Sequence, residues 1–352
     1  MSKSDGMKAL YLEMPDRVPR TEYSVLGHPE LLTRVTGIPV KAGGDPSDWR
    51  RAQQAFLKAW NFDFMWNIDV DNKELGEYYT DMGHAAYAAG GTDFRAVGKS
   101  RFEDEDDVLS FDPCRVLGEK SQEELVAFFN RRYRESCEFW DDAVNMNGVY
   151  ITCMSGLIDL FGWDLLLTAA GVDPKGFGET ANRYADWVMQ YMNAMAKCDS
   201  PVIMLHDDIV WTSGAFLHPD WYRQYIFPNY KRYLKPLLEA GKRVMFTSDG
   251  NYTAFLDDIA ACGFHGFVLE PTTDMAYIAE KYGKTHAFIG NADTRVLLMG
   301  TRDDIYREVK RCMDIGKSCP GFFMAVGNHI PSNTPVDNAL WYNEFYEQMA
   351  GR

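Results

Sequence analysis

The second half of the chain repeats one unit, in which a short apolar run ends at polar residues and a helical stretch follows. Five such units lie between residue 202 and the C-terminus, and their apolar runs are 202–205, 243–247, 266–269, 287–289 and 322–326. Runs that are apolar on both faces are typical of strands buried between helices. Regular alternation of such strands with helices predicts a parallel sheet.

The helices expected after these strands have recognisable boundary residues. Pro219 lies near the first turn of a predicted helix over 219–240, and Gly241 ends it, as proline and glycine commonly do. The remaining helices are expected at 252–261, from about 274, at 302–315 and at 335–349.

The first half of the chain is less regular but contains three further candidate strands, at 18–23, 62–68 and 149–153, with a helical stretch at 157–170. Three and five strands make eight, so we predict an α/β fold, a single-domain (β/α)₈ barrel over residues 1–352. The acidic stretch 103–107 and the glycines around Gly90 are expected to form an insertion that caps the barrel mouth. The alternative is a doubly wound open sheet, but its dinucleotide-binding turn G-x-G-x-x-G is absent.

Charge and cysteine content exclude several classes of partner. The formal net charge is −15, and a strongly acidic surface repels nucleic acid and anionic membranes. The seven cysteines are scattered and form no C-x-x-C pair, which favours reduced thiols in a cytoplasm. The first residues lack the apolar segment of a signal peptide. No uncharged apolar run has the roughly 18 residues of a membrane helix. A cytoplasmic protein is expected.

Every predicted strand ends at polar residues, and in a βα barrel the residues just past the strands share one mouth. The positions concerned are Glu22, Asp69, Asp71, His206, Asp207, Asp208, Ser248, Asp249, Asn251, Glu270, Asn291, Asp293, Asn328 and His329. Asp and Asn also cap helices and form turns. Capping therefore competes with catalysis at Asp293, turn formation competes at Asp249, and one residue of His206–Asp208 is expected to be structural.

Several common catalytic motifs are missing. The sequence has no Walker loop, no G-x-S-x-G elbow and no H-E-x-x-H helix. No lysine stands at a predicted strand end, which disfavours a Schiff-base mechanism.

The strand-end motifs resemble the uroporphyrinogen decarboxylase superfamily, whose fold is a (β/α)₈ barrel. The resemblance lies in the runs HDDIVWTSGAFLHPDWYRQYIFPNYKRYL, VMFTSDGN, FIGNADTRVLLMGTRDDIYREV and GNHIPSNTPVDN, and in the shorter PDRVP and FEDEDDVLSFDP. True uroporphyrinogen decarboxylases carry an R-Q-A-G-R-Y stretch for the carboxylates of their substrate. This chain reads VPRTEYSVLGHPEL, with only Arg17 and Arg20 nearby, so porphyrin decarboxylation is not expected.

The second branch of the superfamily, the cobamide-dependent methyltransferases, fits better. Its coenzyme M-directed members hold zinc with an H-x-C pair and a further cysteine, but those positions are Thr247, Asp249 and Asn328 here. The resemblance therefore implies a demethylating component that moves a methyl group from a methoxylated aromatic compound to cobalt(I). The chain has no D-x-H-x-x-G motif, so the corrinoid (cobalamin) is expected on a separate protein. Zinc would need other ligands, and the resemblance also allows a homodimer.

An aryl methyl ether reacts slowly because phenolate is a poor leaving group, so its oxygen must be protonated or polarised. We expect Asp249 or His329 to do this, with His206, Asp207 and Glu270 holding the donor. The expected substrate-binding residues are Asn251, Asn328, Asp208, Trp211 and Glu22. Aromatic residues expected near the ring are Trp66, Phe161, Trp163 and Trp211. A metal at Asp249, Glu270 and His329 is the alternative to a proton.

Three other functions stay open at this point. The first is a lyase that acts on a smaller carboxylic acid, and the second is a methyltransferase for methylamines or betaine. The third is a binding barrel without catalysis, which the number of polar strand ends disfavours.

Overall fold

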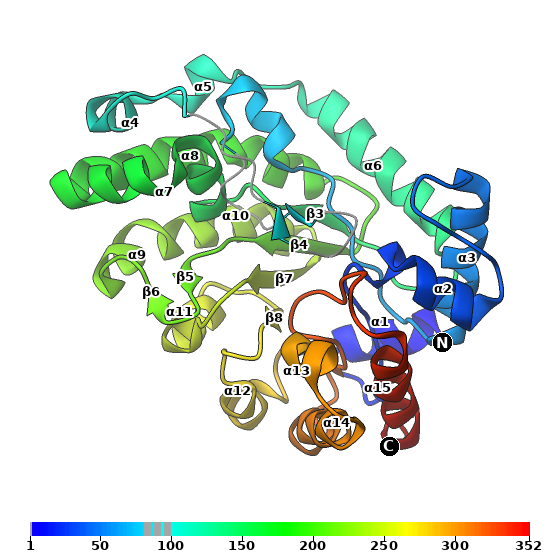
Figure 1. The fold of residues 1–352 in the computed structure, drawn as a ribbon. Coiled ribbons are helices and arrows are strands. Elements are labelled where there is room, and N and C mark those ends of the chain that lie inside the picture. Colours follow the sequence, from blue (N-terminus) through cyan, green and yellow to red (C-terminus); the bar gives the residue numbers. More distant parts are fainter. Residues whose placement is uncertain (1, 81–85, 88–92, 95–99) are drawn as a thin grey trace.

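The computed structural model describes residues 2–80, 86–87, 93–94 and 100–352. Its centre is a parallel sheet of six strands in the order β10-β9-β8-β7-β4-β3 (Figure 1). These strands are β3 (Asn147–Val149), β4 (Val202–His206), β7 (Arg243–Ser248), β8 (Gly266–Leu269), β9 (Ala287–Ile289) and β10 (Phe322–Phe323). The five strands predicted in the second half of the chain are all present, and they are almost entirely buried.

The first and second predicted strands join the two edges of this sheet through isolated bridges. Arg20 pairs with Met324 beyond β10, and Phe64 pairs with Val144 just before β3. The amide of Asp63 donates to the carbonyl of Arg20 at 2.9 Å, which links the two segments to each other. Pro19 has no N–H to donate, which shortens the first ladder. The eight segments complete the predicted (β/α)₈ barrel, although two of them are too irregular to count as strands.

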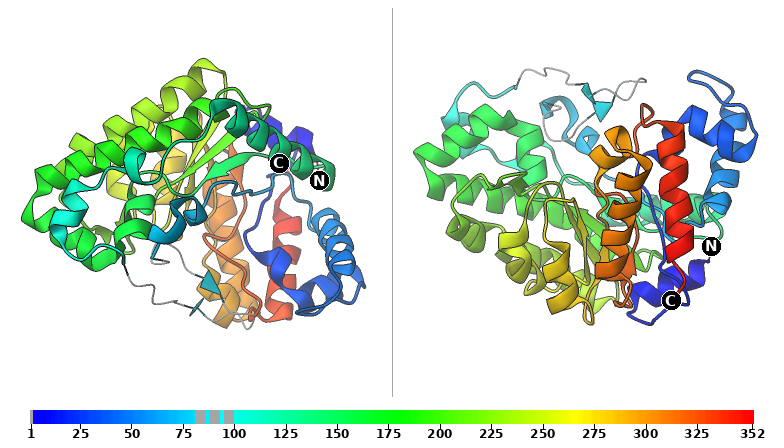
Figure 2. Two further views of the ribbon diagram at one scale, coloured as in Figure 1. Left: turned by 90° about the horizontal axis from the view of Figure 1, so that it is seen from above. Right: turned by 60° about the horizontal axis from the view of Figure 1, so that its bottom comes forward.

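Helices surround the ring on its outside (Figure 2). Those of the second half are α7 (Met154–Val172), α8 (Pro174–Met195), α9 (Pro219–Tyr225), α10 (Phe227–Glu239), α11 (Leu256–Ala260), α12 (Met275–Tyr282), α13 (Thr294–Met299), α14 (Arg302–Gly316) and α15 (Val336–Met349). The earlier ones are α1 (Lys3–Leu10), α2 (Pro29–Thr36), α3 (Pro46–Ala59), α4 (Glu105–Ser110), α5 (Pro113–Val116) and α6 (Gln122–Phe139). Two short antiparallel pairs, β1 (Ala86–Tyr87) with β2 (Asp93–Phe94) and β5 (Val210–Trp211) with β6 (Gly214–Ala215), lie outside the ring.

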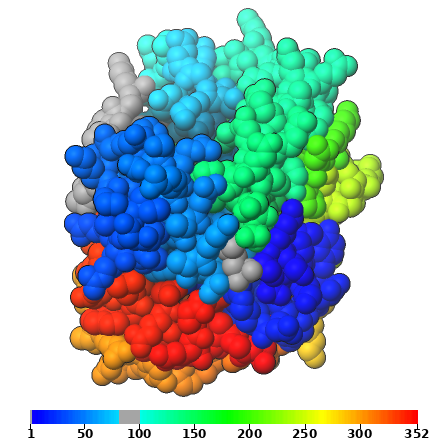
Figure 3. Space-filling model, turned by 90° about the vertical axis from the view of Figure 1, so that its right-hand side faces the viewer, coloured from blue at the N-terminus to red at the C-terminus, as the bar shows by residue number. Residues whose placement is uncertain are grey.

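The two ends of the chain meet on one face of the molecule (Figure 3). The amide of Val18 donates to the carbonyl of Ala350 at 2.8 Å, and the amide of Arg352 donates to the carbonyl of Asp16 at 3.0 Å. These bonds bring α1 and the first barrel segment alongside α15.

Three predicted elements have different boundaries. The third strand was expected at 149–153 but ends at Val149, because the chain bends there and Cys153 already caps α7. The helix expected over 219–240 is interrupted at Ile226, since Pro228 has no N–H for an internal helical bond. The predicted helix 252–261 is a 3-10 turn followed by α11.

The predicted insertion is described only in part. The glycines around Gly90 lie outside the described residues. In the acidic stretch, Asp104 caps α4 by accepting a hydrogen bond from the amide of Asp107 at 3.1 Å. The helix α4 packs against α7 and α8.

Helix α7 is the one helix among the described residues that is long and apolar enough to cross a membrane. Within its most apolar window, 61% of the residues are buried inside the protein, and Gly162 interrupts the helical backbone with φ 71° and ψ 167°. Its apolar composition is therefore that of a core helix.

A buried ion pair stabilises the point where the ring closes. The guanidinium of Arg20 donates to Glu22 at 2.9 Å, and both side chains are fully buried. Glu22 also accepts hydrogen bonds from the Val326 amide at 3.0 Å and the Tyr342 hydroxyl at 2.8 Å. Burial raises the pKa of Glu22 in spite of the nearby Arg20. Glu22, which was predicted to bind substrate, therefore connects the first barrel segment to the last strand and α15.

Replacing Arg20 by alanine should lower the free energy of unfolding by about 3–5 kcal/mol, because Glu22 would remain buried without its cation. Urea denaturation measures this loss. The matched control is Lys58→Ala, which removes an exposed ion pair with Asp142 and should cost at most about 1 kcal/mol. Equal losses in the two variants would show that the Arg20–Glu22 pair does not stabilise the closure.

Candidate active site

A cavity of about 340 Å³ opens at the carboxyl ends of the strands. Its walls are mainly apolar and aromatic, and the part lined by His206, Thr247 and Asp249 is called the polar end. The lining residues are Glu22, Tyr23, Ser24, Leu26, Met65, Trp66, Ile68, Tyr150, His206, Thr247, Ser248, Asp249, Val268, Leu269, Gly327, Asn328 and His329. No lysine or arginine is among the described residues that line it. The cavity therefore suits an apolar or aromatic ligand with one polar group.

Three aromatic side chains form the wall of the cavity. The rings of Tyr23 and Trp66 meet edge to face at 5.1 Å between centroids, and the indole N–H of Trp66 donates to the Tyr150 hydroxyl at 3.5 Å. Tyr150 in turn stacks on the imidazole of His206, with centroids 4.1 Å apart and an interplanar angle of 17°. Such a wall offers flat faces and edges to an aromatic ring.

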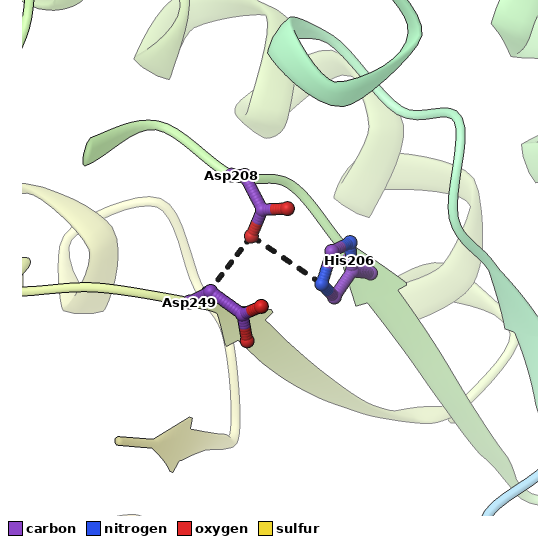
Figure 4. Close-up of side chains that lie close together, drawn as sticks. All are labelled: His206, Asp208 and Asp249. Atoms are coloured by element: carbon purple, nitrogen blue, oxygen red, sulfur yellow. Dashed lines mark hydrogen bonds and ion pairs between the residues drawn. The ribbon is translucent and has the colours of Figure 1, made fainter. Parts of the chain in front are cut away.

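His206, Asp208 and Asp249 converge at the polar end (Figure 4). His206 is the last residue of β4, and Asp249 follows the last residue of the neighbouring strand β7. The Nε2 atom of His206 lies 3.4 Å from Oδ1 of Asp208. The same oxygen accepts a hydrogen bond from the backbone amide of Asp249 at 2.8 Å. Because the two strands are parallel and adjacent, their ends bring these groups together.

Two carboxyl groups at this end, those of Asp249 and Asp208, have raised pKa values. Burial, and then the charge of Glu270, raises the pKa of Asp249 to about 7. Asp249 is nevertheless exposed to the cavity, so a ligand can reach it. Burial, followed by repulsion from Asp249, also raises the pKa of Asp208 well above its ordinary value. Near neutral pH the site can therefore offer a carboxylic acid as a hydrogen-bond or proton donor.

Glu270 and Asn328 lie beside this group. Asn328 donates to Oε1 of Glu270 at 2.5 Å, and the amide of Gly250 donates to Oε2 at 2.8 Å. Glu270 lines an adjoining hollow, whose other lining residues include Asn328 and His329. Asn328 also hydrogen-bonds the side chain of Asp249. The structure therefore places Asp249, Glu270 and His329, three residues singled out in the sequence, at one mouth.

His329 lines the cavity, but its chemistry differs from the expectation. Its Nδ1 lies 2.5 Å from the Ser24 hydroxyl oxygen, and burial lowers the pKa of His329 to about 4. The ring is neutral at pH 7, so it is not the imidazolium that was considered as a proton donor. Asp249 is the better candidate for that role.

Residues 154–348, more than half of the chain, match the family model described as uroporphyrinogen decarboxylase (URO-D). The chain belongs to the URO-D family. It is 29% identical over 168 residues to the uroporphyrinogen decarboxylase of Syntrophotalea carbinolica, covering 48% of this chain and 47% of that protein. It is 27% identical over 162 residues to the enzyme of Geobacter sulfurreducens, covering 46% of each. The chain thus spans about half the length of the curated relatives it matches.

A solved structure extends the likeness to the whole fold. A methyltransferase from Methanosarcina mazei aligns over 98% of both chains, with a TM-score of 0.66 and 18% sequence identity. That likeness supports the barrel fold. Membership of the URO-D family indicates an enzyme.

Asp207 and Asn251 were predicted as site residues of this URO-D family member, but their described hydrogen bonds are with the protein's own helices and turns. Asp207 accepts hydrogen bonds from the Ser155 amide of α7 at 2.7 Å and from the Tyr230 hydroxyl of α10. Burial raises the pKa of Asp207 to about 6. Asn251 accepts from the amide of Thr253 at 3.2 Å, so it caps the following turn. Neither residue lines the cavity.

Asp293 is also a capping residue. It accepts a hydrogen bond from the backbone of Arg295 at the start of α13 and pairs with its guanidinium. The sequence allowed either helix capping or catalysis at Asp293, and these contacts support capping.

Three of the aromatic residues expected near a substrate ring lie elsewhere. Trp211 is 43% exposed and packs against Trp163 and Phe216, at 5.5 and 5.4 Å between centroids. Phe161 is buried against Phe102. Of the four predicted aromatic residues, Trp66 is the one that lines the cavity.

Tyr23, Ser24 and Tyr150 line the cavity but were not predicted as site residues. Tyr150 directly follows β3, so the strand-end rule would have found it if the strand had been placed two residues earlier. Tyr23 follows Glu22 at the end of the first segment. It was not predicted because an aromatic side chain at a strand end is equally typical of the hydrophobic core.

The zinc site of the coenzyme M-directed branch does not fit this chain. Thr247, Asp249 and Asn328 occupy its ligand positions, and none of the seven cysteines lines the cavity. The set Asp249, Glu270 and His329, predicted as a metal alternative, shares one mouth, but it is not the set whose ligand atoms lie closest together. Among the described residues, the ligand atoms that lie within 4.8 Å of one another belong to His206, Asp208 and Asp249.

The raised pKa of Asp249 predicts how stability depends on pH in chelator-treated protein. The folded protein takes up this proton near pH 7, whereas an unfolded aspartate takes it up near 3.8. Stability should therefore increase as pH falls from 8 to 5.5. Urea denaturation should show that Asp249→Asn reduces this increase, because the amide does not titrate.

The control is Glu13→Gln, which removes one charge from an exposed loop residue and should leave the increase unchanged. An Asp249→Asn variant with the same pH dependence as the unaltered protein would contradict the assignment.

Proposed function

We propose that this chain transfers a methyl group from a methoxylated aromatic compound to the cobalt(I) of a separate corrinoid protein. The observation that carries the proposal is the combination, in one cavity, of an aromatic wall with a carboxyl group that keeps its proton near neutral pH. The methyltransferase character of the Methanosarcina mazei neighbour is consistent with it.

The cavity favours a small, weakly charged substrate over a porphyrin precursor. Its volume of about 340 Å³ is at the lower end of ordinary ligand pockets. Trp66 and Tyr150 provide ring faces on one side, and Val268 and Leu269 add apolar surface. A substrate with many carboxylates would meet Asp249 without a lysine or arginine among the described lining residues.

Asp249 supplies the chemical assistance in this proposal. The bond between the methyl carbon and the ether oxygen breaks, the methyl group passes to cobalt(I), and the oxygen takes a proton from Asp249. The aromatic product leaves as a neutral phenol, and Asp249 regains a proton from solvent. General acid catalysis of this kind contributes about 10²–10⁴ in rate. The aromatic wall contributes by aligning oxygen, methyl carbon and cobalt.

Asn328 and Glu270 act on Asp249 in this scheme. The charge of Glu270 is the second cause of the raised pKa of Asp249, after burial. The side chain of Asn328 contacts both carboxyl groups, so it fixes their relative position. Both are positioning residues, since they act on the reaction through Asp249; Glu270 is itself held by the Gly250 amide.

Two other functions have an observation in their favour. The curated relatives are named uroporphyrinogen decarboxylase, which favours a lyase acting on a smaller carboxylic acid. An aromatic wall beside a carboxylate also suits a quaternary ammonium group, which favours a betaine or methylamine donor. The first predicts carbon dioxide release without corrinoid, and the second predicts methyl transfer from amines.

A substrate panel tests the three functions together. The purified chain is incubated with cob(I)alamin and with methoxylated aromatics, methylated amines or small carboxylic acids. Methylated cobalamin, followed by its absorption spectrum, should form with methoxylated aromatics, and Asp249→Asn should slow its formation by about 10²–10⁴. Methylation from amines alone, or release of carbon dioxide alone, would overturn the proposal in favour of the corresponding alternative.

The aromatic wall has its own test. Trp66→Ala should raise the KM for the aromatic donor about tenfold, which corresponds to roughly 1.4 kcal/mol of lost ring contact. The control is Trp211→Ala, because Trp211 lies outside the cavity and its removal should leave KM within about twofold. Steady-state kinetics of both variants measure these KM values. Equal effects would mean that the substrate ring does not bind against Trp66.

A further inference from the structure

We infer that His206, Asp208 and Asp249 form a divalent-metal site with one nitrogen and two oxygen ligands. One ligand atom from each residue lies within 4.8 Å of the other two (Figure 4). Ligands of a tetrahedral zinc ion stand about 2.0–2.2 Å from the metal, and therefore roughly 3–3.5 Å from one another. Small side-chain rotations would bring the three atoms to that separation.

The protein already orients these ligands. Oδ1 of Asp208 is held by the backbone amide of Asp249 at 2.8 Å, and the Ser155 hydroxyl accepts from the amide of Asp208 at 2.8 Å. The imidazole of His206 stacks on Tyr150. Outer contacts that fix the ligands in this way are typical of metal sites and support their affinity.

Thr247 is an independent indication of a polar ligand at this end of the cavity. Its side chain is only 7% exposed, and its hydroxyl has no hydrogen-bond partner among the described residues. Thr247 lines the cavity and stands opposite His206 in the register of β4 and β7. A buried hydroxyl normally has a partner. Water bound to a metal at the neighbouring histidine would provide one.

The charge balance at this end also favours a cation. Asp208, Asp249 and Glu270 repel one another, and no lysine or arginine is among the described residues lining the cavity. A divalent ion would offset two of these charges. One imidazole and two carboxylates suit Zn²⁺, Co²⁺ or Mn²⁺.

This ligand set differs from the histidine and two cysteines of the coenzyme M-directed relatives. Carboxylate oxygens transfer less charge to a metal than thiolates do, so the ion remains a stronger Lewis acid. It would stabilise charge developing on an ether oxygen, in place of the proton of Asp249, and the phenol would then take its proton from water. This role rests on the proposed function, whereas the binding of the metal does not.

Metal binding is measured on the whole purified chain after removal of bound metal with a chelator. Titration with Co²⁺, followed by visible absorption, and with Zn²⁺, followed by calorimetry, should show one ion per chain with a Kd of about 10 µM or tighter. His206→Ala, Asp208→Asn and Asp249→Asn should each weaken binding by about 100-fold or more. Urea denaturation checks that each variant is folded, and the Co²⁺ spectrum of any retained site reports its ligands.

His329→Ala is the matched control, because His329 lines the same cavity but lies outside the group of three. This variant should retain the affinity for metal within about threefold. Absence of stoichiometric binding, or an equal loss of affinity in this control, would overturn the site.

The metal site and the proposed function can fail separately. Stoichiometric metal binding without methyl transfer from any donor would leave the site and remove the function. Methyl transfer at the full rate by metal-free protein would remove the catalytic role of the metal and leave Asp249 as the acid.

Discussion

The barrel depends on the closure of its first segment onto its last strand. Neither the segment near Arg20 nor the one near Phe64 is a regular strand, and each is connected to the sheet by isolated bridges. The buried pair of Arg20 and Glu22 compensates for this short ladder by binding the Val326 amide and the Tyr342 hydroxyl. Arg20 also lies over the ring of Trp60 at 4.3 Å. Burying the charges of Arg20 and Glu22 costs free energy, but the pair joins parts of the chain that are far apart in the sequence.

Closure of the ring determines the electrostatics of the mouth. Once the strands are parallel and closed, the polar residues that follow β4, β7 and β8 meet in a small volume, and the raised pKa values of Asp208 and Asp249 show that these two carboxyl groups resist ionisation. At neutral pH such a cluster opposes folding, since ionised carboxylates in the unfolded chain repel one another less. Clusters that lower the stability of the folded state in this way are common at catalytic centres. Either a proton or a divalent cation relieves the repulsion, and both would assist departure of an ether oxygen.

Strand-end position located residues at the barrel mouth, but it did not distinguish side chains that face the cavity from those that face the helices. His206 and Asp208 turn toward the cavity end, whereas Asp207, between them, turns toward α7 and satisfies the start of that helix. Neighbouring residues leave an extended backbone in opposite directions, so one residue of the three had to point away. Trp211 was misplaced for a related reason, because β5 carries it away from the barrel mouth to a surface cluster.

The alternation of apolar runs and helical stretches determined a parallel α/β sheet, since strands that are apolar on both faces need both faces covered. The count of eight candidate strands favoured a barrel over a doubly wound sheet, and the bridges of the two irregular segments to the sheet edges decided it. The sequence also determined which chain segments contribute Asp249, Glu270 and His329, because polar residues directly follow the strands. Only the tertiary structure decided that His206, Asp208 and Asp249 form the closest group, that His329 is neutral, and that Tyr150 rather than Trp211 lines the cavity. Those properties depend on distances and burial between residues far apart in the chain, which local patterns do not encode.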